Sequence, residues 1–342
     1  MDLIQTTPII GPKAWRGADL ARDTSWIVTL TDADLADLDR ALAAARASGR
    51  PLAEIDRASF PLTVMQPKLE QAVAEMRDGR GFLLLRGLPV DRYSDDDVGL
   101  IFWGMGRYMG GPLSQNPQGD LLGHVYDHGR TYGNIDVRGY ETNAYLPYHT
   151  DAGDMVGLLC LRRGLEGGLS SIVSSVTVHN EILAHHPEYL GLLYNGFYYI
   201  RREEALGSKG VSDRPVPVFG ARDGVVSCRY IRNQINAGAV KRETPHTTLE
   251  KAALDFMDEQ TRRADLRLDM DLQPGDIQLC NNYTILHSRT GFRDGPERAQ
   301  QRHMLRLWLK FPRSWPLDAE FPEQLGYQRA EGPRGKPALI EA

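Results

Sequence analysis

The first third of the chain carries apolar residues three or four positions apart, which is the spacing of a helix that buries one face. Over residues 31–49, Thr31 and Asp34 stand in capping-box positions, with Asp in place of the usual Glu, and a glycine ends the run. A second helix is expected after Pro67 and a third over about 94–109. The N-terminal part is therefore expected to be largely helical.

A different pattern begins at FLLLRGL, residues 82–88, a short continuous apolar run between turn residues that predicts a buried strand. From about Leu113 onward, short strand-like runs such as GLLCLRR, GGLSSIVSS and RHMLRLWLKF alternate with Gly, Asn and Asp. Two helices are expected among them, near 178–193 and 249–263. Several short strands separated by turns favour a β-sandwich or barrel, so the pattern predicts an α+β fold in one domain.

Composition and charge narrow the class of partner. The 342 residues are 42% hydrophobic and 25% charged, which is ordinary for a globular protein. The formal net charge is -5 and Lys and Arg are scattered, so we expect small-molecule partners and no nucleic acid. No apolar stretch approaches the about 18 residues of a membrane span, and the N-terminus lacks an export pattern. We therefore expect a cytoplasmic protein without membrane contact.

The three cysteines fit that expectation. Cys160, Cys228 and Cys280 are odd in number, far apart in the chain and each set in an apolar or strand-like stretch. Because disulfide frameworks belong to small secreted domains, we expect three reduced thiols in the core.

Candidate chemistry begins with the stretch PYHTDAGD, in which His149 and Asp151 stand two residues apart. Residues i and i+2 of a strand point to the same face, so both side chains can reach one ion at a strand end. An octahedral Fe(II) bound by two imidazoles and one carboxylate keeps positions open for substrate and oxygen. His287 is the best candidate for the second imidazole, near the end of a strand expected to begin at residues 274–276.

Each part of this pattern also has an ordinary interpretation. An HxD pair occurs often by chance, and two polar residues near a strand end need no metal. His124 and His128 have a spacing that could itself suit a metal, although a substrate-contact or hydrogen-bonding role is favoured for His124.

Two arginines follow His287 on one predicted strand face, which carries Arg302, Met304, Arg306 and Trp308. Buried arginines need anions to meet them, and the planar guanidinium pairs bidentately with a carboxylate such as that of 2-oxoglutarate. Salt bridges at a sheet surface would be favoured for an isolated strand. Together with the HxD pair and His287, the anion-binding role is preferred.

In this order, HTD at 149–151, GGLSS at 167–171, LHSR at 286–289 and RHMLR at 302–306 resemble the taurine dioxygenase and 2,4-dichlorophenoxyacetate dioxygenase family of Fe(II)/2-oxoglutarate oxygenases. The resemblance spans roughly 81–311, and its specificity comes from the ordered set. It implies a double-stranded β-helix, or jelly roll, of the clavaminate synthase type with helices packed outside.

Along the chain, the resemblance implies a single oxygenase domain over 1–342. Residues 1–110 would pack on a jelly-roll core at 111–311. Residues 114–148 are rich in Gly, Asn and Tyr and precede the candidate metal ligands, so we expect them to form a lid over the site. Residues 312–342 are rich in Pro and Gly and are expected to form a C-terminal tail.

The resemblance also implies roles for single residues: His149, Asp151 and His287 as iron ligands, Arg302 with Ser170 on the far carboxylate of 2-oxoglutarate, and Arg306 on an anionic substrate. The interval from His287 to Arg302 is longer than the family usually shows, and Arg298 stands nearer the usual interval. Arg302 is preferred because it begins the apolar alternation, whereas Arg298 lies in a polar stretch.

The activity implied is the oxidation, by default the hydroxylation, of a small polar or anionic metabolite with O2, Fe(II) and 2-oxoglutarate, giving succinate and CO2. Asn116, His124 and Tyr145 are expected to contact the substrate beside Arg306, although Asn116 and Tyr145 equally suit turns. A homo-oligomer is compatible with the sequence. Two alternatives remain open: a zinc-dependent hydrolase using the same His/Asp/His site, and a non-catalytic jelly-roll binding protein.

Overall fold

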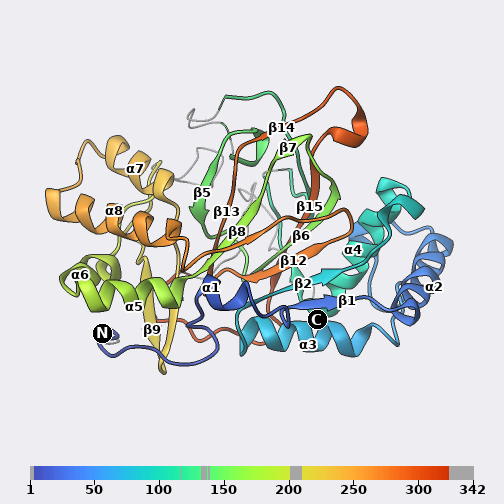
Figure 1. The fold of residues 1–342 in the computed structure, drawn as a ribbon, viewed down its shortest axis with the longest axis horizontal. Helices are drawn as coiled ribbons and strands as arrows, with labels where there is room; N and C mark the ends of the chain where they lie inside the picture. The colour runs from blue at the N-terminus through green and yellow to red at the C-terminus, as the bar shows by residue number, and fades with distance from the viewer. Residues whose placement is uncertain (1–3, 117, 132–136, 138, 201–209, 323–342) are drawn as a thin grey trace, which may run out of the picture.

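The computed structural model describes residues 4–322 apart from 117, 132–136, 138 and 201–209. Two sheets face each other at the centre, and helices cover both outer faces (Figure 1). Parts of the predicted lid and most of the predicted C-terminal tail lie outside the described residues.

The large sheet has the strand order β1 (Ile27–Thr29), β2 (Phe82–Arg86), β12 (Ile277–Asn281), β6 (Met155–Arg162), β15 (His303–Lys310), β3 (Gly111–Pro112), with β4 (Leu122–Val125) also paired to β15. The small sheet has the order β11 (Leu268–Met270), β8 (Ser170–Ser174), β13 (Ile285–Arg289), β5 (Leu146–His149). Apart from the parallel pair β1 and β2, the strands within both sheets are antiparallel, and together they form the double-stranded β-helix core.

The space between the sheets is filled by alternate residues of the facing strands, because side chains of a strand point to opposite faces in turn. Phe82, Cys160 and Met304 of the large sheet belong to the same buried cluster as Ile172 and Ile285 of the small sheet. All three cysteines are buried and free, as predicted.

Helices from the N-terminal third cover the outer face of the large sheet: α2 (Asp32–Ser48), α3 (Gln66–Arg77) and α4 (Asp95–Met109). The predicted start of α2 is present as a full capping box between Thr31 and Asp34, and Gly49 ends the helix in the left-handed conformation at φ 62°. Leu305, Leu307 and Leu309 of β15 pack into this layer, opposite the face that carries Arg306.

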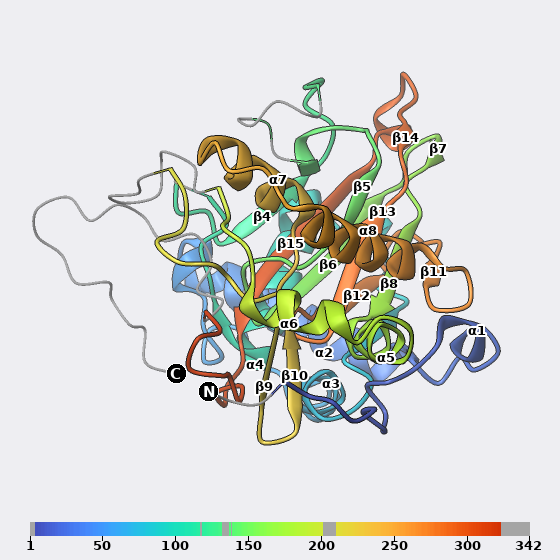
Figure 2. The same ribbon diagram turned by 90° about the vertical axis from the view of Figure 1, so that its left-hand side faces the viewer.

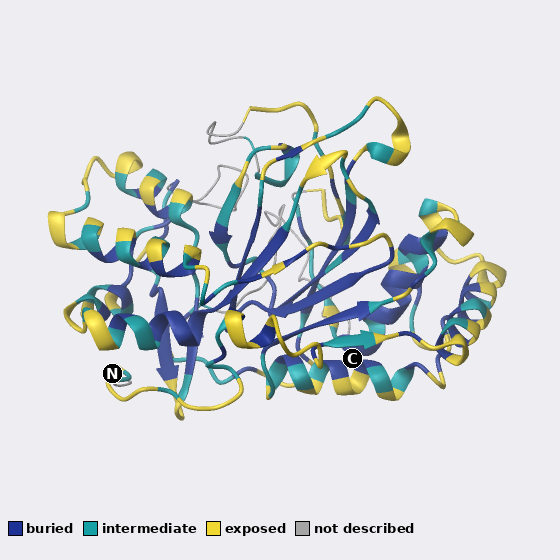
Figure 3. Cartoon of the chain, viewed as in Figure 1, coloured by how far each residue is buried: buried dark blue, intermediate teal, exposed yellow. Residues whose placement is uncertain are grey.

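A second helical layer covers the small sheet and consists of α5 (Ser175–His185), α6 (Glu188–Asn195) and α8 (Thr248–Arg262) (Figure 2). The remaining described elements include α1 (Gly17–Leu20), α7 (Arg232–Lys241) and four short 3-10 turns (Leu52–Glu54, Val90–Arg92, Gly139–Glu141, Arg298–Gln300). They also include the hairpin of β9 (Phe219–Arg222) and β10 (Val225–Cys228), and the antiparallel pair of β7 (Glu166–Gly167) and β14 (Phe292–Arg293), which are far apart in the chain. Figure 3 shows buried residues concentrated in the two sheets and in the helix faces that cover them. Among the described residues, no helix has the length and apolar character needed to cross a bilayer.

Two sequence predictions about elements were wrong in detail. The helix expected over 178–193 is two helices, because His186 leaves the helical conformation before Pro187, whose ring also removes an amide donor. The strand expected to run from 274–276 to His287 is two strands, β12 and β13, separated by an asparagine-rich turn. The helix α7 was not predicted, since it buries only Ile235 and Gly238 and has little apolar periodicity.

The chain after β5 is held by buried polar contacts to both sheets. The Asp154 carboxylate accepts hydrogen bonds from the Tyr283 hydroxyl at 2.7 Å and from the Phe311 amide at 2.9 Å. The Asn282 side chain accepts from the amide of Asp151 at 3.1 Å and donates to the Gly153 carbonyl at 2.8 Å. These contacts fix the path of the segment that carries Asp151.

We expect Asp154→Ala to lower the free energy of unfolding by about 2–4 kcal/mol, because two buried donors lose their acceptor. Tyr283→Phe removes one of the two hydrogen bonds and keeps the ring, so it should cost about 1 kcal/mol. Urea denaturation followed by circular dichroism measures both. Equal losses in the two variants would contradict this account of the segment.

Candidate metal centre

His149, Asp151 and His287 converge between the two sheets. His149 is the last residue of β5 and lies directly opposite His287 of β13 in the antiparallel register, with ring centroids 4.3 Å apart. Asp151 follows two residues later, with its carboxylate oxygens 3.9 Å from His149 Nε2 and 3.6 Å from His287 Nε2. The three ligand atoms lie within 4.8 Å of one another, and this is the only such His/Cys/Asp/Glu group among the described residues. The donor set fits one octahedral ion with positions left open.

The orientation of His149 is set by a hydrogen bond to the backbone. Its Nδ1 lies 2.8 Å from the Pro147 carbonyl, so Nδ1 carries the proton and donates, and Nε2 keeps a free lone pair toward Asp151. Fixing the distal ring nitrogen in this way is a common means of orienting a ligating histidine.

Burial keeps both imidazoles neutral. Desolvation and the neighbouring His149 lower the pKa of His287 to about 3, and desolvation also lowers the pKa of His149. Burial alone would raise the pKa of Asp151, but Arg306, the two histidines and a hydrogen bond outweigh it and lower that pKa. At neutral pH the three side chains are therefore in the protonation states that bind a metal.

Two supporting residues had no assigned role in the sequence. The Trp308 indole nitrogen donates to Asp151 Oδ2 at 2.9 Å, and Asn282 accepts from the Asp151 backbone amide. The signal for Trp308 was its alternation with Arg306 on one face of the predicted strand. Asn282 carried no signal, because only the turn after β12 brings it to Asp151.

Arg302 is buried immediately before β15, with 7% of its surface exposed. Its Nη1 has no hydrogen-bond partner among the described residues, and its guanidinium lies 5.3 Å from the centre of the Phe292 ring. It packs against Gly168, where an added Cβ would lie 3.0 Å from Arg302 Nε. Desolvation lowers its pKa to about 10. A buried guanidinium in this position calls for an anion from outside the chain.

Ser170 and Arg298 are placed differently. Ser170 begins β8, two residues beyond Gly168, and its hydroxyl donates to Gln278 Oε1 at 2.5 Å. The Arg298 side chain is 76% exposed and pairs with Asp95 at 2.7 Å. Of the two arginines considered from the sequence, Arg302 is therefore the one enclosed in the protein.

Arg306 faces the triad from β15. Its Nη1 lies 3.7 Å from Asp151 Oδ2, and its guanidinium carbon lies 4.7 Å from the centre of the Tyr140 ring and 4.5 Å from that of Trp308. Its Nε donates to Gln115 Oε1 at 2.7 Å. Neither Gln115 nor Tyr140 was singled out in the sequence, because both lie in the irregular segment before β5.

The other predicted substrate contacts, His124, Asn116 and Tyr145, have the following places in the structure. His124 pairs with Leu305 in the β4–β15 ladder, on the face opposite Arg306, and its Nδ1 lies 2.9 Å from His303 Nε2. Asn116 exchanges hydrogen bonds with Asp120 and so shapes a turn. Tyr145 is 43% exposed just before β5.

His128 stacks on Tyr126 with ring centroids 4.2 Å apart. Among the described residues, neither His124 nor His128 belongs to a group that could hold a metal.

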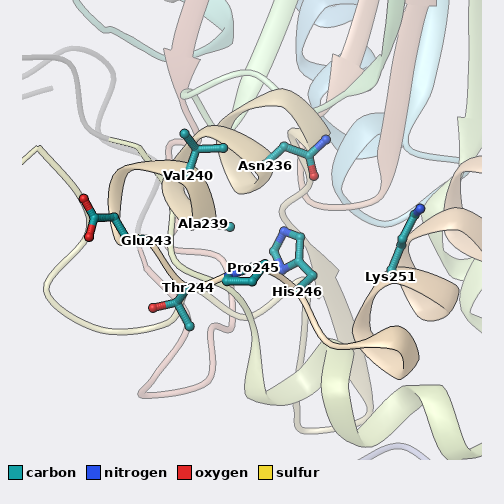
Figure 4. Close-up of a pocket in the computed structure, with 8 residues that line it drawn as sticks. All are labelled: Asn236, Ala239, Val240, Glu243, Thr244, Pro245, His246 and Lys251. Atoms are coloured by element: carbon teal, nitrogen blue, oxygen red, sulfur yellow. The ribbon is translucent and has the colours of Figure 1, made fainter.

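A separate pocket of about 490 Å³ lies beside α7 and the loop that leads into α8 (Figure 4). It is lined by Asn236, Ala239, Val240, Glu243, Thr244, Pro245, His246 and Lys251. No triad residue lines it, so it is distinct from the metal centre.

Sequence comparison identifies one family model and two related proteins that each match most of this chain. A family model described as "Taurine catabolism dioxygenase TauD, TfdA family" matches residues 48–308. FR-33289 synthase of Streptomyces rubellomurinus is 30% identical over 326 residues, which cover 94% of this chain and 95% of that protein. The taurine hydroxylase-like protein SAT17 of Stachybotrys chartarum is 28% identical over 308 residues, covering 86% and 77% respectively.

Solved structures share the fold. An asparagine oxygenase in complex with Fe(II), 2S,3S-3-hydroxyasparagine and succinate has a TM-score of 0.65 at 18% identity, covering 83% of this chain and 93% of that chain. The non-heme iron oxygenase OrfP in complex with Fe and alpha-ketoglutaric acid has a TM-score of 0.60 at 16% identity, covering 83% and 94%. A further structure holds OrfP in complex with Fe, succinate and (3S)-hydroxy-L-Arg, at a TM-score of 0.61 and 16% identity, covering 83% and 94%.

We expect Trp308→Phe to weaken binding of a divalent metal such as Mn²⁺ about tenfold, because Asp151 Oδ2 loses the donor that orients it. Isothermal titration calorimetry of metal-free protein measures the change. Trp315→Phe is the matched control, since the Trp315 indole is also buried and hydrogen-bonded, but to Ser227. The same loss of metal affinity in both variants would exclude a specific role for Trp308.

Proposed function

The chain belongs to the TauD, TfdA family of Fe(II)- and 2-oxoglutarate-dependent oxygenases, and we propose that it hydroxylates a small polar or anionic metabolite with formation of succinate and CO2. The observation that carries this proposal is the pair of inward-facing arginines beside the triad. In the part of the chain that the structure describes, Arg302 has a buried nitrogen without a hydrogen-bond partner, and Arg306 approaches Asp151. Together they suit two anions, a co-substrate and a substrate.

We assign His149, Asp151 and His287 as the iron ligands. Their protonation states and the mutual approach of their ligand atoms support this assignment. The bound iron supplies the redox chemistry that couples reduction of O2 to oxidation of 2-oxoglutarate and of the substrate. Trp308 and Asn282 keep the Asp151 carboxylate and backbone in place for that ligation.

We assign Arg302 to the far carboxylate of 2-oxoglutarate. A fixed guanidinium presents a planar set of donors to a carboxylate, and a buried site strengthens the ion pair. Gly168 leaves the room in which the Arg302 side chain lies, and Phe292 covers it. We assign the Ser170 hydroxyl as a second hydrogen-bond donor to this carboxylate. In the structure this hydroxyl donates to Gln278 Oε1.

We assign Arg306 to an anionic group of the substrate. Its approach to Asp151 puts a bound anion next to the metal, and binding there orients the rest of the substrate toward the reacting centre. The apolar side chains between the sheets, among them Ile172, Val156 and Met304, exclude water from this space. The hydroxylated amino acids bound in similar oxygenases support hydroxylation of a small polar substrate here.

Titration of metal-free protein with Fe(II) and then 2-oxoglutarate in the absence of O2 tests the assignment. We expect the visible charge-transfer band of an iron-bound keto acid in the wild type and its loss in His149→Ala. Arg302→Ala should need at least about tenfold more 2-oxoglutarate to reach the same absorbance, because a charged hydrogen-bond partner is lost.

Arg298→Ala is the control, since Arg298 is exposed and paired with Asp95, and it should titrate as the wild type does. Weaker binding in Arg298→Ala, with Arg302→Ala unchanged, would transfer the role to Arg298. Folded, iron-loaded wild type that gives no band would argue against the proposed use of 2-oxoglutarate at this site.

A further inference from the structure

The side chain of Gln115 contacts both the backbone and the guanidinium of Arg306. Gln115 Nε2 donates to the carbonyls of Arg306 at 2.8 Å and of Leu121 at 2.9 Å, and Gln115 Oε1 accepts from Arg306 Nε at 2.7 Å. Gln115 is 2% exposed, so these bonds are shielded from competing water. One amide therefore fixes where the Arg306 side chain begins and which way its guanidinium turns.

The neighbouring strand makes room for this amide. Gly123 of β4 lies opposite Arg306 in the ladder, and a Cβ there would come within 2.4 Å of Gln115 Oε1. Any larger residue at this position would displace the Gln115 side chain. The glycine is thus required by the contact between Gln115 and Arg306.

Two aromatic rings lie within cation–π distance of the same guanidinium. Trp308 comes from the strand of Arg306, whereas Tyr140 comes from the segment that precedes β5 and packs on the cluster between the sheets. Rings at 4.5 and 4.7 Å stabilise the cation and restrict its rotation. Tyr140 therefore helps to hold the Arg306 guanidinium in this orientation.

Among the described residues, the Arg306 side chain makes its hydrogen bond through Nε, so the edge formed by its two terminal nitrogens is the one that could meet a ligand. A guanidinium has five N–H donors, and Gln115 occupies the one on Nε. Nη1 stays 3.7 Å from Asp151 Oδ2, which is beyond hydrogen-bonding distance although the charges are opposite and buried. The hydrogen bond to Gln115 therefore holds the Nε side of the guanidinium while Nη1 stays apart from Asp151.

We propose that Gln115 is a positioning residue which, with Tyr140, preorganises Arg306 as the receptor for the anionic group of the substrate. The inference rests on the proposed role of Arg306. It adds that affinity for this anionic group depends on residues that act through Arg306. Because the guanidinium is already oriented, less rotamer entropy is lost on binding.

The test uses methylphosphonate as the probe and Mn²⁺ as a paramagnetic ion in the metal centre, with saturating 2-oxoglutarate. Broadening of the probe's ³¹P resonance reports binding near the ion and yields a dissociation constant for weak ligands. The Zn²⁺-loaded protein supplies the diamagnetic baseline. Circular dichroism and the Fe(II)·2-oxoglutarate band, recorded for every variant, show that the fold and the co-substrate site are intact.

We expect Gln115→Met to bind the probe about tenfold more weakly than wild type, because Arg306 loses a charged hydrogen bond. Gln115→Glu should bind it more weakly still, since a carboxylate against Arg306 neutralises the receptor, and it serves as the second variant if the methionine protein does not fold. Tyr140→Leu should weaken binding, and Tyr140→Phe, which keeps the ring, should restore it.

Arg306→Ala separates failure of this inference from failure of the proposed function. If Arg306→Ala loses the probe while Gln115→Met and Gln115→Glu bind it as tightly as wild type, the positioning role is overturned. If Arg306→Ala binds as wild type does, or wild type shows no broadening, Arg306 is not the receptor and the inference falls with it. Equal loss in Tyr140→Phe and Tyr140→Leu would remove Tyr140 from the proposal.

Discussion

The pairing of β5 with β13 is the constraint on which the site depends. It puts His149 opposite His287 on the inner face of the small sheet, while Tyr148 and Leu286 point to the helical layer outside. Because side chains alternate along a strand, a slip of one residue would turn either histidine out of the interior. The register is held from the other side as well, since Thr150 and Tyr230 exchange hydrogen bonds just beyond β5.

The second constraint is the burial of opposite charges in unequal number. Asp151 is the carboxylate of the centre, and Arg302 and Arg306 both face the same interior. Arg289 of β13 is also buried, but its guanidinium has partners within the chain, among them the carbonyls of Thr142 and Ala144. Burying the guanidinium groups of Arg302 and Arg306 beside one carboxylate is costly, and the cost is offset when further anions bind. The arrangement of Arg302 and Arg306 therefore favours the binding of anionic ligands.

The helices α2, α3 and α4 could be predicted because their apolar spacing and end signals are local, as at Thr31 and Gly49. The split between α5 and α6 and the turn between β12 and β13 also depend on local sequence. They were not predicted, because short apolar runs do not show where one element ends and the next begins. The position of His124, in contrast, depends on a contact between distant parts of the chain, which local sequence does not indicate. Its sequence setting suggested a substrate contact, yet the ladder register with Leu305 turns it to the far face of the sheet.

The sequence by itself determined the residue types of the centre, their order along the chain and the family to which they point, because an HxD pair, a distant histidine and two alternating arginines form a specific set. Only the tertiary structure decided that Arg302 is enclosed and Arg298 exposed. Only the tertiary structure brought Gln115, Tyr140, Trp308 and Asn282 to the ligands and arginines they support. The physical reason is that a hydrogen bond between residues 115 and 306 depends on strand register and packing, which no local pattern records.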